Sequence, residues 1–100
     1  MDTPKSIVIL GRRWFQRTYG NTYHTATVIV DGETMFSTPK EYGYGDQYRE
    51  TAFRELEARK LIPARLEHAN GSHECSWQWE ERTGIKVGYS CADVAREKDL

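Results

Sequence analysis

The chain has 100 residues with 14 lysines and arginines against 15 aspartates and glutamates, for a formal net charge of −1. This balance argues against binding to nucleic acid through bulk charge, although it leaves a local basic patch open. Apolar residues make up 38% of the chain and aromatic residues 12%, and no apolar run approaches the roughly 18 residues of a membrane span. The length predicts one soluble domain over residues 1–100, with a core of its own.

The start of the chain has an acid at Asp2, followed by only a short apolar run. A signal peptide needs a longer apolar segment, so we expect the protein in the cytoplasm. Thiols stay reduced there. We therefore interpret Cys75 and Cys91 as small core residues that would pair only under oxidation. No cofactor and no membrane contact are expected.

Strand-forming residues dominate the first half of the chain. Segments 6–16 and 22–30 are rich in β-branched and aromatic residues, and Gly20-Asn21 separates them, which predicts a hairpin. Asp31-Gly32 predicts a two-residue turn into a third strand over residues 33–38. The expected register of that turn pairs Val30 with Glu33, Val28 with Met35 and Ala26 with Ser37. Pro39 ends the third strand.

A helix is predicted from Asp46 to about Leu61. Asp46 suits the N-cap position. Apolar side chains at Tyr48, Ala52, Phe53 and Leu56 recur at helical spacing and are expected to pack on the sheet. Charged residues fill the other side, where Glu50 with Arg54 and Glu55 with Arg59 are spaced for i,i+4 pairing. We interpret that side as a solvated face, and Pro63 closes the element.

Strand patterning returns after Pro63. With Arg82-Thr83-Gly84 as a hairpin loop, the large apolar residues fall on one face. In this register Trp79 faces Val87, Trp77 faces Tyr89 and Cys75 faces Cys91. The two cysteine Cα atoms are then expected within about 4.4 to 6.8 Å.

Ser90 and Asp93 resemble a capping box that opens a short helix from Cys91 to about Lys98. The elements together predict an α+β fold. It consists of an antiparallel sheet of about five strands packed against one main helix, with a short C-terminal helix.

Tyr42-Gly43-Tyr44-Gly45-Asp46-Gln47-Tyr48 is the most distinctive motif, with three tyrosines and two glycines just before the helix. Aromatic rings on a backbone that glycine leaves free to bend suit a recognition surface. Tyr48 falls on the core side of the helix. Tyr42 and Tyr44 are the stronger candidates for contact with a partner.

A second cluster runs from Arg12 to Arg17. Alternation places Arg13, Phe15 and Arg17 on one face and Arg12, Trp14 and Gln16 on the other, so each face couples guanidinium groups with one ring. Such a surface suits phosphates and stacked bases. The alternative is that Phe15 faces the core with Ala26 and Val28, while the arginines form salt bridges along the sheet or with the acidic helix.

Three motifs of the first 60 or so residues resemble a family of short uncharacterised proteins from bacteriophages and prophages. They are Arg12-Arg13-Trp14-Phe15, Tyr19-Gly20-Asn21-Thr22-Tyr23-His24 and the Tyr42 to Tyr48 motif. The resemblance implies a phage or prophage origin, and with it the cytoplasm of the host cell. It implies no activity.

More distantly, three antiparallel strands followed by Gly43-x-Gly45 and a helix resemble the core of a double-stranded-RNA-binding domain. That family reads the minor groove with a His-containing loop before the second strand, and holds phosphates with basic residues at the start of the helix. The resemblance places His24 near the first of these. Tyr48, Arg49 and Ala52 occupy the second, where only one residue is basic.

Catalytic and metal chemistry have weaker support. His24 lies in a predicted strand with no serine or cysteine nucleophile assigned near it, so we interpret it as a hydrogen-bonded structural group. His68, His73, Cys75 and Cys91 lack the spacing of structural zinc ligands, so no metal is predicted.

The favoured function is non-enzymatic binding. We expect a small phage-type accessory protein that engages a host or defence macromolecule, with a protein as the favoured partner. The candidate contact residues are Tyr42, Tyr44, Arg12, Arg13, Trp14, Arg17 and His24. The alternative is a nucleic-acid-binding module that uses the same residues, followed by a small enzyme or metal protein. The oligomeric state stays open.

Overall fold

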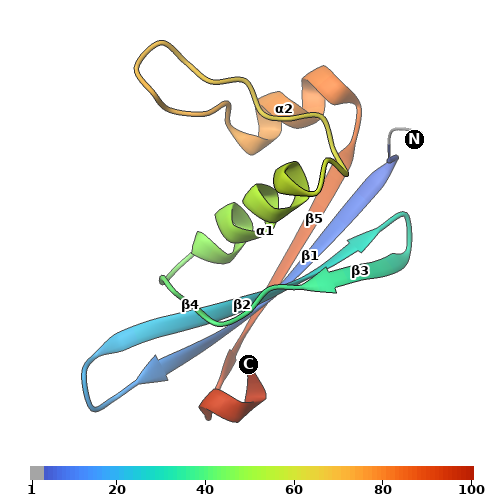
Figure 1. Cartoon of the computed structure of the whole chain (residues 1–100). Coiled ribbons are helices and arrows are strands. Elements are labelled where there is room, and N and C mark those ends of the chain that lie inside the picture. The colour runs from blue at the N-terminus through green and yellow to red at the C-terminus, as the bar shows by residue number, and fades with distance from the viewer. Residues whose placement is uncertain (1–3) are drawn as a thin grey trace.

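The computed structural model describes residues 4–100 and shows an α+β architecture, a five-stranded mixed sheet with two helices (Figure 1). The expectation drawn from Asp2 lies outside the described residues. The elements are β1 Ser6–Gln16, β2 Asn21–Val30, β3 Glu33–Ser37, β4 Glu41–Tyr42, α1 Gln47–Ala58, α2 Ser76–Thr83, β5 Lys86–Val94 and a 3-10 turn, η1, Glu97–Asp99. Strand order is β3-β2-β1-β5, and β4 pairs with β2. No helix within residues 4–100 is long and apolar enough to cross a membrane.

The predicted N-terminal hairpin and third strand are confirmed, with one change of register. β1 and β2 pair antiparallel, and Val30 faces Glu33 as expected. A shift between Val28 and Ile29 then sets Val28 opposite Phe36 instead of Met35. The same shift places Thr27, not Ala26, opposite Ser37. An extra residue in one strand reverses the faces that follow, so Phe36 is buried and Met35 is exposed.

The predicted C-terminal hairpin is wrong, and the sheet is not strictly antiparallel. β5 pairs in parallel with β1, which sets Cys91 beside Gly11. Cys75 is the N-cap of α2 and does not belong to a strand. The two cysteines therefore do not face each other in a hairpin, and both thiols are free. Cys91 packs against the core, but Cys75 is exposed, so its interpretation as a core residue is wrong.

The two tryptophans explain why Ser76–Thr83 forms a helix. A helix turns by about 100° per residue, so side chains two positions apart point to nearly opposite sides. Trp79 is fully buried, whereas Trp77 is 61% exposed. The Gln78 side chain accepts a hydrogen bond from the Cys75 N–H at 3.1 Å. Gly84, at φ 76°, ends the helix instead of closing a hairpin loop.

The structure also tests the two predicted helices, the C-terminal one and the main one. The predicted helix from Cys91 to Lys98 is wrong, because β5 continues to Val94 and only η1 is helical beyond it. The main helix is confirmed with Asp46 at the N-cap position, although the Asp46 side chain makes no capping hydrogen bond, and the helix ends at Ala58 instead of about Leu61.

The predicted ion pairs on the solvated face of α1 are confirmed in part. Arg59 and Glu55 lie 2.7 Å apart, as expected. Arg54 pairs with Glu41 and Glu50 pairs with Arg65, so the expected Glu50–Arg54 pair is wrong.

Helix α1 covers one face of the sheet, and the core lies between them (Figure 1). Tyr48 packs directly on the backbone of Gly11, where an added Cβ would lie 2.5 Å from the Tyr48 ring. Trp79 meets the Phe53 ring edge to face, with centroids 5.3 Å apart. We call the other side of the sheet the open face, and its strand residues include the partly exposed Val8 and Leu10.

Candidate binding surface

Strands β1 and β2 continue beyond the N-terminal end of α1 as a two-stranded projection (Figure 1). We call residues 12–23, together with residues 40–45 that lie against them, the arm. The turn that closes it has Gly20 at φ 70° and a hydrogen bond from the Gly20 N–H to the Gln16 carbonyl at 2.8 Å. The glycine-rich segment before α1 runs alongside, because Tyr42 pairs with Tyr23 and the Gly43 N–H donates to the Thr22 carbonyl at 2.9 Å.

His24 holds this segment in place from the interior. One ring nitrogen, Nδ1, lies 3.1 Å from the Gly43 carbonyl, and Nε2 lies 2.7 Å from the Thr51 hydroxyl. The side chain is buried, at 1% exposure. His24 therefore links loop, strand and helix, and it is not on the surface that a partner would meet.

One side of the arm belongs to the open face and carries a row of three rings. Trp14 stacks on Tyr23 at 5.9 Å with 26° between the planes. Tyr42 meets the other side of Tyr23 edge to face at 5.9 Å. The Lys40 ammonium lies 5.0 Å from the Tyr23 centroid, a cation–π contact.

The other side of the arm is on the helix side of the sheet, beyond the end of α1. The Arg13 guanidinium donates to the Gly45 carbonyl at 3.0 Å. Phe15 and Tyr44 line the same hollow of about 460 Å³. Phe15 therefore points to the side of Ala26 and Val28, as the alternative held, but it is not part of the buried core.

The structure thus divides the predicted contact residues between two sides of one projection. Arg12, Trp14 and Tyr42 lie on the open-face side, while Arg13 and Tyr44 lie on the helix side. Arg17 lies in the turn at the tip. Sequence reasoning did not identify Tyr19, Tyr23 and Lys40 as parts of this surface. The sequence did carry a signal for the two tyrosines, because Tyr19 precedes the turn glycine and Tyr23 alternates onto the side of Trp14.

Most basic side chains in and beside the arm already have an acidic or carbonyl partner within the chain. Arg13 pairs with Asp93 at 2.9 Å, and Lys40 pairs with Glu97 at 2.8 Å. Arg12 donates to the Asp99 carbonyl at 3.1 Å. Within residues 4–100, Arg17 is left as the arginine of this region with no such partner. The arm is therefore aromatic in character and close to neutral.

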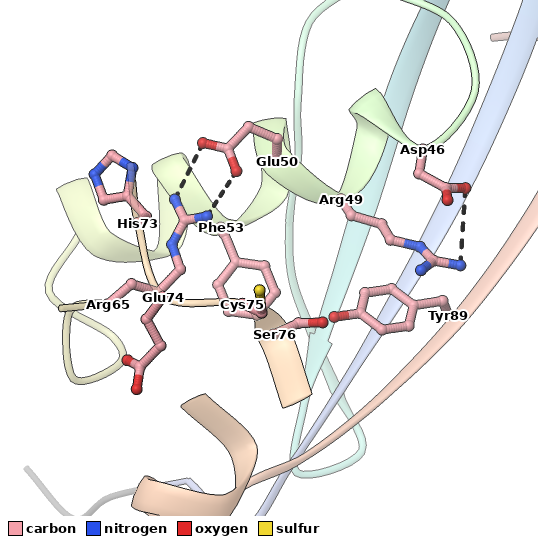
Figure 2. A pocket seen from close by; sticks show the side chains of 10 residues that line it. All are labelled: Asp46, Arg49, Glu50, Phe53, Arg65, His73, Glu74, Cys75, Ser76 and Tyr89. Atoms are coloured by element: carbon pink, nitrogen blue, oxygen red, sulfur yellow. Dashed lines mark hydrogen bonds and ion pairs between the residues drawn. The ribbon is translucent and has the colours of Figure 1, made fainter. Parts of the chain in front are cut away.

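A second hollow, of about 400 Å³, lies between α1, β5 and the segment that leads into α2 (Figure 2). Its main feature is Arg65, which donates to Glu50 at 2.6 Å and to Glu57 at 2.7 Å, and lies over the Phe53 ring. The Arg65 side chain is only 8% exposed. The hydrogen bonds from Arg65 hold the pKa of Glu50 below its ordinary value.

The other charged side chains of this hollow also have partners within the chain, whereas one buried hydroxyl does not. The Arg49 guanidinium lies 4.0 Å from the centroid of Tyr89, whose hydroxyl is buried without a hydrogen-bond partner; burial raises the Tyr89 pKa. Arg82 binds Glu74 at 2.8 Å and lowers the Glu74 pKa. The Arg65, Arg49 and Arg82 side chains thus each face an acidic side chain of the chain.

Metal coordination also has no support in the geometry. Among residues 4–100, no three His, Cys, Asp or Glu side chains come together in a way that would hold a metal ion. His68 and His73 lie in the loop between the helices. Cys75 begins α2 and Cys91 lies in β5.

Comparison of the chain with protein-family models, with curated proteins and with solved structures found no match. The resemblances to phage proteins and to double-stranded-RNA-binding domains therefore stay predictions. The function is inferred from the side chains of the arm and of the segment beside it.

Proposed function

We propose that this protein is a small non-enzymatic binding protein whose arm holds a partner protein, in the manner of a phage accessory protein that acts on a host or defence protein. The observation that carries the proposal is a group of large aromatic side chains that the fold leaves in solvent. Four of them are more than half exposed: Phe15 55%, Tyr19 74%, Tyr42 64% and Tyr44 75%. Single exposed rings are common, but a group at one end of a molecule is typical of an interaction site.

The charges favour a protein partner over a nucleic acid. Phosphate binding needs free basic side chains, which neutralise phosphates and displace the counterions condensed on the nucleic acid. Arg13 and Lys40 are instead paired with Asp93 and Glu97. Tyrosine-rich contact surfaces with a few arginines are typical of the energetic centres of protein interfaces. Binding through the arm should therefore depend only weakly on salt.

A nucleic-acid partner is the second candidate, and the row of Trp14, Tyr23 and Tyr42 supports it. Stacked rings on an open sheet face are a platform for unpaired bases. Arg12 and Lys40 flank the row, but a phosphate would have to displace the Asp99 carbonyl and the Glu97 carboxylate from them. Contacts of these two side chains with phosphates would make binding fall steeply with salt concentration, which separates the two candidates.

A capture experiment tests the proposal. Tagged wild-type protein, Tyr42→Ala/Tyr44→Ala and Trp77→Ala would be exposed to nuclease-treated host lysate at about 0.05 and about 0.5 M salt. Trp77 is the matched control, because its ring is equally exposed but lies on α2. We expect a protein retained by the wild type and by the control at both salt concentrations, and lost with the double variant. Capture that needs nucleic acid, or that fails at high salt for all three proteins, would contradict the proposal.

A further inference from the structure

Strand β5 forms one edge of the sheet, and its outer side has no strand neighbour in the described part of the chain. The Lys86 N–H donates to the Lys5 carbonyl at 3.2 Å, on the side where β1 pairs. Backbone groups of successive strand residues point to opposite sides. The N–H and C=O groups of the odd-numbered residues 87–93 therefore point outward.

The first outward donor is already used. The Val87 N–H donates to a carboxylate oxygen of Glu80, on α2, at 2.7 Å. The outward N–H groups of Tyr89, Cys91 and Asp93 have no acceptor among the hydrogen bonds of residues 4–100. These three residues form a free hydrogen-bonding edge that is centred on Cys91.

This edge lacks the bulges, prolines and unpaired charges that usually prevent an edge strand from pairing with another chain. Its pairing with β1 is regular from Lys86 to Val94, without a bulge or a proline. Its only lysine stands at the start, and the Asp93 carboxylate is neutralised by Arg13. The residues on the open face are small, namely Gly88, Ser90 and Ala92. At the opposite edge, β3 has five residues and an irregular register.

We propose that a second copy of this chain pairs antiparallel with β5 about a two-fold axis at Cys91. Tyr89 then lies opposite Asp93 of the second copy, and Cys91 lies opposite its own counterpart. Each of the three pairs exchanges two backbone hydrogen bonds. The pairing uses all three free outward residues and leaves the Val87–Glu80 hydrogen bond intact.

A second copy of the chain is the partner that fits this edge, because the outward N–H and C=O groups of residues 89–93 match those of an antiparallel second copy. One free regular edge per chain gives a closed dimer and not a fibre. The net charge of −1 per chain adds little repulsion. A register centred on Ser90 would need the Val87 N–H, which Glu80 holds. The dimer involves the edge of the sheet, and its tests do not depend on the function proposed for the arm.

A cysteine cross-link tests the register. Directly opposed residues in a hydrogen-bonded antiparallel pair have Cα atoms about 5.5 Å apart, within disulfide range. Burial raises the pKa of the Cys91 thiol, so a copper–phenanthroline oxidant is used to speed the reaction. We expect Cys75→Ser to form a covalent dimer through Cys91. The matched variant Cys91→Ser, which keeps the exposed Cys75, should form far less.

Sedimentation velocity tests the interface without a cross-link. Pairing of one short strand edge buries little surface and gives a weak dimer, so concentrations up to about 0.2 mM are used. Ser90 lies opposite Ala92 of the second copy, and both are exposed. Ser90→Lys/Ala92→Lys places like charges across the axis and should weaken the dimer about tenfold. Ser90→Glu/Ala92→Lys places opposite charges there and should strengthen it.

Three results would overturn the dimer. One is a monomer at every concentration together with no cross-link through Cys91. Another is a dimer that responds to neither charge pair, which would place the interface elsewhere. The third is a chain that stays monomeric alone and pairs at this edge only with a strand of another protein.

Discussion

The two halves of the β1–β2 hairpin differ in what covers them. Where α1 lies over the sheet, the helix-side residues Ile7, Ile9, Ala26 and Val28 are fully buried. In the arm, the same alternation continues, but the helix-side position of Phe15 is 55% exposed. Residue type changes with the cover, from aliphatic side chains to aromatic rings and arginine. The covered half provides the stability of the fold, and the arm presents the side chains that we assign to binding.

Removal of a central core ring should have the largest effect on stability. Trp79→Ala leaves a cavity beside Phe53 and leaves the Pro63 carbonyl without its hydrogen bond from Trp79. We expect a loss of about 3 to 5 kcal/mol in the free energy of unfolding, measured with urea. Trp77→Ala in the same helix is the control and should change it by less than about 1 kcal/mol. Equal effects of the two substitutions would mean that the helix faces are assigned wrongly.

The close contact at Gly11 should come next. An added Cβ would lie 2.5 Å from the Tyr48 ring, which is buried between helix and sheet. Gly11→Ala should therefore destabilise the fold by about 1 to 3 kcal/mol. Gly88→Ala is the matched control in the neighbouring strand, because its Cβ would come no nearer than 3.9 Å to Val8. If Gly11→Ala is neutral, α1 does not sit on β1 as described.

The Arg65 cluster should contribute a smaller and pH-dependent amount. Hydrogen bonds from Arg65 hold the folded-state pKa of Glu50 below its ordinary value of 4.5. The stability from this pair is therefore fully present above pH 4.5, and it is lost as the pH falls through the folded-state pKa. Glu50 is partly exposed, so screening by solvent limits the contribution.

Unfolding of Arg65→Met between pH 7 and pH 3 measures this contribution. We expect a loss of about 1 to 2 kcal/mol at pH 7 that shrinks in acid. Arg59→Met, which breaks the exposed pair with Glu55, is the control and should cost at most about 0.5 kcal/mol. A difference between wild type and Arg65→Met that grows in acid would show that the sign is wrong.

The arm should give the smallest effect on stability. Tyr42→Ala/Tyr44→Ala removes two exposed rings, of which only Tyr42 contacts another ring in the arm. We expect its free energy of unfolding to stay within about 1 kcal/mol of the wild type, while partner binding weakens by about 2 kcal/mol. A variant that unfolds would show that these rings support the start of α1.

Local signals in the first half of the chain were sufficient to predict its first three strands and the main helix, but not the short strand β4. Asp31-Gly32 identified the second turn, and the spacing of Tyr48, Ala52 and Leu56 identified α1. The register shift in β3 was not visible, because Met35 and Phe36 are both apolar and either can face a core. Which of the two side chains is buried depends on contacts with α1, which packs on that face of the sheet.

The second half could not be predicted from periodicity. Trp77 and Trp79 fit a strand with both rings on one face, and equally a helix with one ring inside. Only the partners of Trp79, which are Phe53 and the Pro63 carbonyl, decide between the two. The parallel pairing of β5 with β1 joins residues about 80 apart in the sequence, which no local pattern reports.

The candidate surface was predicted in part. Alternation correctly placed Arg12 and Trp14 on one side and Arg13 and Phe15 on the other. It could not show that the C-terminal end supplies partners for Arg12, Arg13 and Lys40. Those long-range contacts change the interpretation of the arm from a basic surface to an aromatic one.

Photo-cross-linking tests most directly the claim that a protein partner contacts the arm. Benzoylphenylalanine is introduced in place of Tyr44 in one protein and in place of Trp77 in another, both at exposed positions. After irradiation in host lysate treated with nuclease, we predict a covalent adduct with a host protein from position 44 and none from position 77. Adducts from position 77 alone, or adducts at position 44 only with nucleic acid in untreated lysate, would contradict the account.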